Sequence, residues 1–317
     1  MAAPDRQSRK FSKPVHRPVL LREVLRELDL SPGLTVLDGT VGAAGHSVKI
    51  WPKIQPNGML IGLDRDPMML AYASTKLRPN PTDATGIILE QSSYADAATV
   101  LETHQIEQVD RVLLDLGLSS DQLASDDRGF SFQATGDLDL RFDPSRGHPA
   151  WKMLQDWTES ELAEIFEEYG EERYSRRIAA AIEKHRQENA KPLRSAEEFT
   201  SLVLQAIPNS ARQDAPRKHP ATRVYQALRI AVNQELDHLR QALDETLPRI
   251  VRPGGRVLII TFHSLEDRMV KTAFRGASWQ TTQTGPSKAL KPISASPDEV
   301  RLNPRARTAR LRVAIRA

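Results

Sequence analysis

The 317-residue sequence contains no cysteine, which excludes disulfide bonds, thiolate catalysis, zinc fingers and iron–sulfur clusters. Long hydrophobic runs are also missing. The run Val257–Phe262 has the length of a strand, whereas a membrane-spanning helix needs about 20 apolar residues. The segment Met1–Lys13 is polar and basic and lacks the apolar stretch of a secretory signal. We therefore expect a cytoplasmic protein with no membrane segment.

Acidic residues are scarce at both ends of the chain, although the net charge is only +3. By contrast, seven glutamates and no base lie between Thr158 and Glu172. Basic termini can bind a polyanion, but they are also common as solvated tails, and composition leaves both readings open. The basic residues are Arg6, Arg9, Lys10, Lys13 and Arg17 at the start and Arg301, Arg305, Arg307, Arg310, Arg312 and Arg316 at the end.

Short apolar runs alternate with helix-like segments in the first third of the chain and again near its end. This alternation predicts an α/β fold with a parallel, Rossmann-like sheet that binds ligands at the carboxyl ends of its strands. The expected strands are Leu34–Leu37, Met59–Leu63, Gly86–Glu90, Arg111–Leu114, Arg256–Thr261 and Leu311–Ile315.

The middle of the chain contains no convincing strand from Asp137 to about Arg217. After this stretch the α/β pattern returns with one expected long helix, Val224–Leu247. We therefore predict a sheet domain of residues 1–136 and 217–317 that is interrupted by an all-helical inserted domain of residues 137–216. The helices expected in the insertion are Trp151–Tyr169, Glu171–Gln187 and Ser195–Ile207.

Three of the expected strands end at an acid: Asp38, Asp64 and Asp115. Asp38 opens a loop with glycines at 39, 42 and 45, a spacing that differs from the G-x-G-x-x-G of dinucleotide folds. An acid at this point would also repel phosphate, so a ligand with a ribose and a cationic group fits better, such as S-adenosylmethionine (SAM). Asp64 can then accept from both ribose hydroxyls. A tight turn without a ligand, a helix cap at Asp64 or Asp66, and NAD binding remain open.

Motifs spread over almost the whole chain resemble those of the bacterial 16S rRNA (cytosine-N4)-methyltransferase family, known as RsmH or MraW. A single one of these motifs could arise by chance, but the same motifs in the family's order are very specific. They are His16–Leu21, Asp38–Ser47, Gly62–Pro67, Leu113–Leu123, Arg128–Phe132, Leu138–Pro144, Tyr169–Glu172, His219–Arg223, Ala227–Asn233, Phe262–Arg268 and Asn303–Arg307.

The resemblance implies SAM-dependent methylation of the exocyclic N4 amine of a cytidine in the decoding region of 16S rRNA, in the small ribosomal subunit. It also implies a methyltransferase domain with a helical insertion, and it leaves a homodimer open. Ala44 stands where the family usually has glycine, and Tyr94 replaces the commoner phenylalanine. The positions that the family uses to contact SAM are Ala44, Gly45, His46, Asp64, Tyr94, Asp115 and Gln122.

The acceptor for the cytidine amine is a separate question. DNA amino-methyltransferases commonly carry two prolines and an aromatic residue after the acidic or polar residue that ends the fourth strand, and Asp115–Ser120 lacks all three. We take Asp115 as the first catalytic candidate, because an acceptor at the amine favours its nucleophilic form and can receive its proton. Ser120 and Asp139 follow as alternatives.

Four residues at the two crossings into the insertion are candidate RNA contacts: Asp139 and Arg141 at its start, and His219 and Arg223 at its return. The alternatives are a local ion pair for the first two and a turn before Pro220 for His219. We place RNA along the basic termini and away from the glutamate-rich face. No histidine pair has the spacing of helical metal ligands, so no metal is expected. A non-catalytic RNA-binding assembly factor and a NAD-dependent oxidoreductase are the competing functions.

His263 precedes a plausible capping box, Ser264–Asp267. We expect this motif to start a helix, and a contact between His263 and the substrate remains open.

Overall fold

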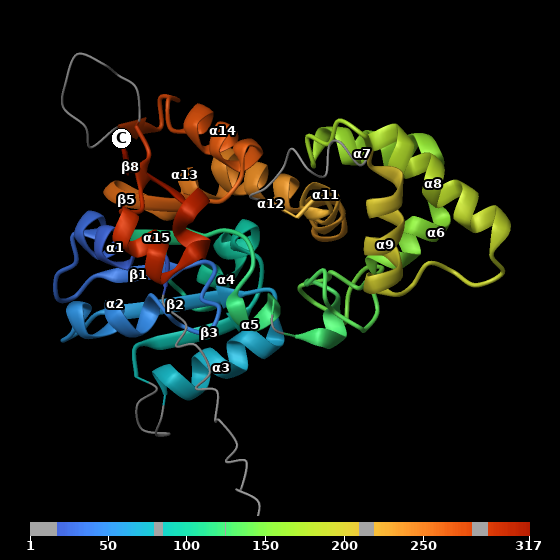
Figure 1. The fold of residues 1–317 in the computed structure, drawn as a ribbon. Coiled ribbons are helices and arrows are strands. Elements are labelled where there is room, and N and C mark those ends of the chain that lie inside the picture. The colour runs from blue at the N-terminus through green and yellow to red at the C-terminus, as the bar shows by residue number, and fades with distance from the viewer. Residues whose placement is uncertain (1–17, 79–84, 124, 209–218, 281–290) are drawn as a thin grey trace, which may run out of the picture.

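A computed structural model describes residues 18–78, 85–123, 125–208, 219–280 and 291–317. Within them, eight strands form one sheet in the order β3-β2-β1-β4-β5-β8-β6, with β7 paired to β8 (Figure 1). The first five strands are parallel, and β8 runs antiparallel to β5. The predicted α/β, Rossmann-like fold is confirmed. The strands are β1 (Thr35–Asp38), β2 (Met59–Asp64), β3 (Ile87–Gln91), β4 (Val109–Asp115), β5 (Val251–Thr261), β6 (Trp279–Gln280), β7 (Ile293–Ser294) and β8 (Arg310–Arg316).

Helices cover both faces of the sheet, so its central strands are apolar on both sides. In β4, Val112 and Leu114 pack into one core while Leu113 packs into the other, and all three are fully buried. The first face is covered by α4 (Ala97–Thr103), α12 (Glu235–Gln241), α13 (Leu247–Ile250) and α14 (Ser264–Ala273). The second is covered by α1 (Leu21–Leu28), α2 (Ser47–Ile54), α3 (Pro67–Leu77) and the 3-10 helix η5 (Pro304–Thr308).

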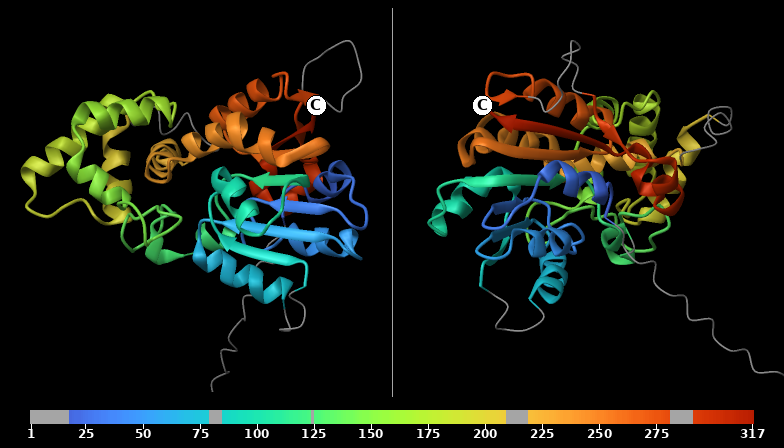
Figure 2. Two further views of the ribbon diagram at one scale, coloured as in Figure 1. Left: turned by 180° about the vertical axis from the view of Figure 1, so that it is seen from behind. Right: turned by 90° about the vertical axis from the view of Figure 1, so that its left-hand side faces the viewer.

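A second group of helices lies beside the sheet and has a core of its own (Figure 2). We call it the helical region; Phe166, Ile182, Phe199 and Tyr225 are among its core residues. Its core continues past the predicted insertion into the helix that follows residue 218, and the predicted boundary at 216/217 lies outside the described residues. The region comprises α6 (Ala150–Asp156), α7 (Glu159–Glu168), α8 (Ser175–Glu188), α9 (Ala196–Ala206) and α11 (Thr222–Asn233).

The prediction of one helix over Val224–Leu247 is wrong. The chain breaks at Gln234, which has a φ of 51°, and resumes as α12, the π-helical turn η4 (Ala242–Thr246) and α13. Tertiary hydrogen bonds at Asn233 explain the break. Its carbonyl accepts from Arg65 at 2.5 Å, and its amide side chain donates to the Leu140 carbonyl at 2.7 Å.

The predicted helix Trp151–Tyr169 is also two helices. Thr158 has extended backbone and caps α7, with its backbone N–H and hydroxyl both donating to Glu161. The short helices α5 (Ser120–Leu123) and α15 (Pro297–Leu302) and the 3-10 helices η2 (Tyr94–Asp96) and η3 (Asp126–Arg128) complete the assigned elements. None of the helices in the described ranges is both long and apolar enough to cross a membrane. The predicted basic N-terminal arm lies outside those ranges.

Candidate active site

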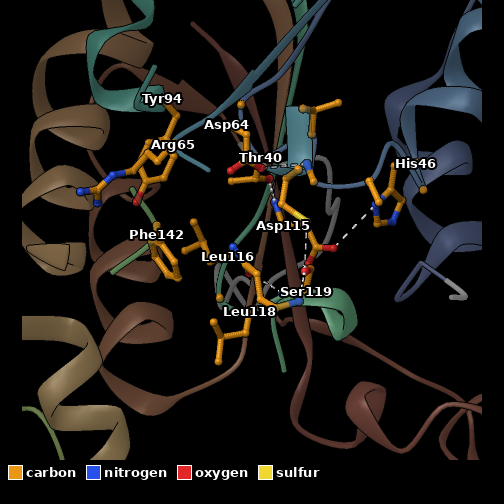
Figure 3. Close-up of a pocket in the computed structure, with 18 of the residues that line it drawn as sticks. Thr40, His46, Asp64, Arg65, Tyr94, Asp115, Leu116, Leu118, Ser119 and Phe142 are labelled. Carbon is orange, nitrogen blue, oxygen red and sulfur yellow. Dashed lines mark hydrogen bonds and ion pairs between the residues drawn. The ribbon is translucent and has the colours of Figure 1, made fainter. Parts of the chain in front are cut away.

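A pocket of about 1040 Å³, counted with the solvent at its mouth, opens at the carboxyl ends of β1, β2, β4 and β5 (Figure 3). This is the edge of the sheet where the sequence predicted a ligand. Six of the seven predicted cofactor contacts line it: Gly45, His46, Asp64, Tyr94, Asp115 and Gln122.

Ala44 is the exception. It is fully buried, its methyl group belongs to a sheet core, and it does not line the pocket. The expectation that this methyl group meets the ligand is therefore not met. Its φ of 61° lies in the left-handed region, which glycine adopts at less cost. A glycine at this position would thus be favoured by the backbone and not by the ligand.

Asp38 holds the loop that follows β1. It is 2% exposed, accepts a 2.6 Å hydrogen bond from the Ser47 hydroxyl, and accepts from the Thr40 N–H at 3.3 Å. Burial raises its pKa, and these donors oppose the rise. Asp38 thus connects the loop to the first turn of α2 and leaves the pocket to the residues between them.

Asp64 and Asp66 divide the two roles that the sequence left open. Asp66 is fully buried and caps α3 by accepting from the Met68 N–H at 3.0 Å. Asp64 lines the pocket, with one carboxylate oxygen accepting from the Gly42 N–H and the other from the Asp66 N–H, both at 2.9 Å. Each oxygen retains a lone pair for a ligand hydroxyl. Burial raises the pKa of Asp64 to about 7.

Asp115 has an unsatisfied buried oxygen. Its Oδ1 makes no hydrogen bond within the described part of the chain, while its Oδ2 lies 3.7 Å from His46 Nδ1. His46 Nε2 bonds to the Val19 carbonyl at 2.9 Å and therefore carries the proton, so Nδ1 of neutral His46 presents a lone pair to Asp115. Burial raises the pKa of Asp115 to about 7, although the Arg305 charge opposes it. A donor or a cation would complete this site.

Gln122 lines the pocket, but its amide is already used. The amide nitrogen donates to Asp66 at 2.8 Å, and the oxygen accepts from the Ser119 N–H at 2.9 Å. Asp66 also accepts from Arg128 at 2.6 Å. Gln122 therefore attaches the loop after β4 to the start of α3, and any contact with a ligand is made by its remaining surface. The side chain of the alternative acceptor, Ser120, lies outside what the structure describes.

The four predicted RNA contacts separate into two pairs. Arg141 forms a two-point ion pair with Asp139, at 2.6 and 2.7 Å, which is the local alternative considered for them, and neither residue lines the pocket. His219 and Arg223 line a second cavity between the helical region and the sheet. The His219 ring stacks on Phe132, with centroids 4.5 Å apart and planes at 15°.

Five residues line the pocket that the sequence did not single out: Arg65, Phe142, Glu235, Glu266 and Arg305. Phe142 lies close to Arg65 and Tyr94 in the pocket (Figure 3), and the Arg65 guanidinium is 5.8 Å from its ring centre. The Leu138–Pro144 motif marked this segment, but only the tertiary structure shows which of its side chains enters the pocket. Glu266 accepts from the backbone N–H groups of Phe262 and His263, as expected for the start of α14.

The geometry fits a ligand with hydroxyl groups and a positive centre, because two half-buried carboxylates face the pocket and one of their oxygens lacks a partner. An aromatic ring, Tyr94, is available to stack on a base. Within the described ranges, no group of three or more histidine, aspartate or glutamate side chains could hold a metal ion.

Comparison with known proteins agrees with this geometry. The sequence profile of the MraW methylase family matches residues 13–317. Ribosomal RNA small subunit methyltransferase H from Trichlorobacter lovleyi is 44% identical over 312 residues, which cover 94% of this chain and 97% of that protein. The protein of the same name from Symbiobacterium thermophilum is 40% identical over 316 residues, covering 95% and 96%.

Among solved structures, a SAM-dependent methyltransferase from Aquifex aeolicus aligns with 94% of this chain and 90% of its own, at 10% identity and a TM-score of 0.40. The match to the family profile and the identity to the two relatives establish the relationship. The chain belongs to the MraW methylase family, with S-adenosylmethionine as its cofactor.

Proposed function

We propose that this protein transfers a methyl group from SAM to the exocyclic N4 amine of a cytidine in the decoding region of 16S rRNA, in the small ribosomal subunit. Relatives at 40–44% identity carry the name of a small-subunit rRNA methyltransferase. The observation that carries the chemistry is Asp115, a carboxylate in the pocket with one buried oxygen that no described residue satisfies.

The pocket residues divide among the parts of the cofactor. Asp64 would accept from the ribose hydroxyls, Tyr94 would stack on the adenine, and Phe142 would close the same side. Gly45 and His46 would border the amino-acid end, with Ala44 shaping their loop through its backbone. Gln122 supports Asp115 by holding the loop after β4. When bound, SAM supplies a methyl group on a positively charged sulfur, which is a good leaving group.

The protein's task is to position and activate the amine. The amine lone pair is delocalised into the pyrimidine ring, and an acceptor at one N–H favours the pyramidal, nucleophilic form. Asp115 is suited to this role because its pKa of about 7 is near the working pH of a general base. Leu116 and Leu118 flank it as apolar walls that exclude water (Figure 3). Holding the reactants in line can supply about 7–11 kcal/mol.

The proposal for the RNA contacts follows the separation of the two pairs. His219 and Arg223 face the second cavity and are proposed to contact RNA. Asp139 and Arg141 are proposed to order the segment that carries Phe142, because Arg141 also donates to the Arg146 and Gly147 carbonyls. Residues 137–216 remain the proposed substrate-recognition insertion.

The test is transfer of labelled methyl from SAM to purified small subunits. Wild-type protein is expected to label the RNA, while Asp64→Ala is expected to lose SAM binding and Asp115→Ala to lose transfer. Circular dichroism checks that both variants are folded. RNA that stays unlabelled in the presence of a protein with measurable SAM affinity would overturn the proposal and favour a non-catalytic assembly factor.

A further inference from the structure

The second cavity is a groove of about 1600 Å³, counted with the solvent at its mouth, between the helical region and the carboxyl end of β5. It shares its wall with the pocket. Glu266 and Arg305 line the pocket, whereas His263 and Arg307, close to them in sequence, line the groove. A strand of RNA with one base in the pocket must therefore lead its neighbouring nucleotides past this wall.

The groove is positively charged. Arg307 is exposed and has no ion-pair partner among the described residues. Arg223 donates to the Glu171 carbonyl at 2.8 Å, a neutral acceptor that leaves its charge uncompensated. Arg310 is 53% exposed even though it pairs with Asp267 at 2.9 Å. The acid of the lining, Glu171, is engaged by the Ser264 hydroxyl at 2.8 Å and lies 3.6 Å from Arg268.

The groove also offers a flat ring for stacking. His219 and Phe132 are parallel at 4.5 Å, and Tyr225 packs edge-on against Phe132 at 4.8 Å. Burial lowers the pKa of His219, so its ring is neutral at pH 7 and loses little solvation when a base covers it. Single-stranded RNA is bound largely by stacking of unpaired bases on such rings.

One buried polar atom of the groove has no partner. The His263 side chain is 9% exposed, and its Nδ1 makes no hydrogen bond with any described residue. A buried polar atom without a partner costs roughly 1–3 kcal/mol unless a ligand or water satisfies it. The edge of a nucleobase carries both donors and acceptors and would meet that need.

We propose that the groove binds the nucleotide next to the methylated cytidine, with its phosphate between Arg223 and Arg307, its base on the His219–Phe132 stack and its edge at His263. This assignment rests on the proposed function. It divides the RNA contacts into a pocket for the reacting base and a groove for its neighbour.

The experiment measures binding of a fluorescently labelled RNA fragment from the decoding region by anisotropy at several salt concentrations. Arg223→Gln and Arg307→Gln are each expected to weaken binding and to lower the slope of log affinity against log salt by about one. His219→Ala is expected to weaken binding on the order of 10-fold with an unchanged slope. His219→Phe, which keeps a ring for stacking, should retain the affinity.

The matched control is Arg301→Gln, which removes the same charge from α15, outside the groove. The Arg301 side chain is 76% exposed and pairs only locally with Asp298. It should leave RNA affinity and slope unchanged, and all variants should keep wild-type SAM affinity by calorimetry. Wild-type RNA affinity in the groove variants would overturn the proposal and point to a ribosomal protein in the groove. Equal losses in the Arg301 variant would overturn it too.

Failure of the proposed function gives a different result. In that case the wild-type protein labels no RNA, whereas anisotropy still reports whether the groove binds it. If the wild-type protein methylates RNA and the groove variants bind and methylate it normally, only the assignment of the groove fails.

Discussion

Replacing Asp115 by asparagine is expected to stabilise the cofactor-free protein while abolishing methyl transfer. Burial raises the pKa of Asp115 from 3.8 to about 7 in the folded protein, so the ionised carboxylate destabilises the fold at neutral pH. At about 1.4 kcal/mol per pH unit, this difference corresponds to at most about 4 kcal/mol. Because 24% of the side chain is exposed, water screens part of it, and we expect roughly 2 kcal/mol.

The pH dependence identifies the source of this gain. Since the folded-state pKa is the higher one, the protonated carboxyl contributes stability that is fully present below about pH 4 and is lost as the pH rises toward 7. Asparagine does not ionise, so the advantage of the variant should grow between pH 4 and 7 and then stay constant. Thermal unfolding without SAM should show a melting temperature about 4 °C above wild type at pH 8 and a much smaller gain at pH 4.5.

The control is Asp156→Asn, which neutralises a half-exposed acid at the end of α6 that pairs with Lys152 at 3.1 Å. Its stability should change by less than about 1 kcal/mol. An Asp115→Asn protein that melts below wild type at pH 8, or whose gain is the same at both pH values, would refute the role assigned to burial. Full methyl transfer by this variant would refute its role as the acceptor.

Three further predictions concern the cofactor and the connection to the helical region. Because burial raises the pKa values of Asp64 and Asp115 to about 7, SAM affinity should fall by up to about tenfold per pH unit below pH 7; a flat calorimetric profile between pH 5.5 and 8.5 would contradict this. Tyr94→Phe should keep SAM affinity and Tyr94→Ala should lose about tenfold, since stacking needs the ring and not the hydroxyl; equal losses would exclude a stacking role. Asn233→Ala should lower the free energy of unfolding by roughly 2–4 kcal/mol in urea, because it leaves the Phe142 N–H and the Leu140 carbonyl without their partner. A loss below about 1 kcal/mol would show that water replaces the amide.

The fold was largely predictable because its central strands are buried on both faces and appear as uninterrupted apolar runs. The helix breaks were not, because their causes are distant in sequence. Asn233 ends α11 through bonds to Arg65 and Leu140, residues from two other parts of the chain. The antiparallel direction of β8 was likewise not specified by its apolar pattern, which is the same in either direction.

In the site, strand ends and small residues predicted where the carboxylates lie, since parallel strands bring their carboxyl ends to one edge. The sequence could not show that Ala44 faces the core, because this depends on a left-handed backbone at one position. Nor could it show that Phe142 enters the pocket. Its backbone is held by Asn233 at its N–H and by Arg128 at its carbonyl, contacts that exist only after folding.

The most direct test of the central claim is the chemical identity of the methylated nucleoside. Small subunits treated with wild-type protein and labelled SAM are digested to nucleosides and analysed by mass spectrometry, beside an Asp115→Asn control. The account predicts label in N4-methylcytidine from the decoding region and none in the control. Label on the ribose, on ring carbon 5 or on another base would contradict it, because an acceptor at Asp115 serves only an exocyclic amine.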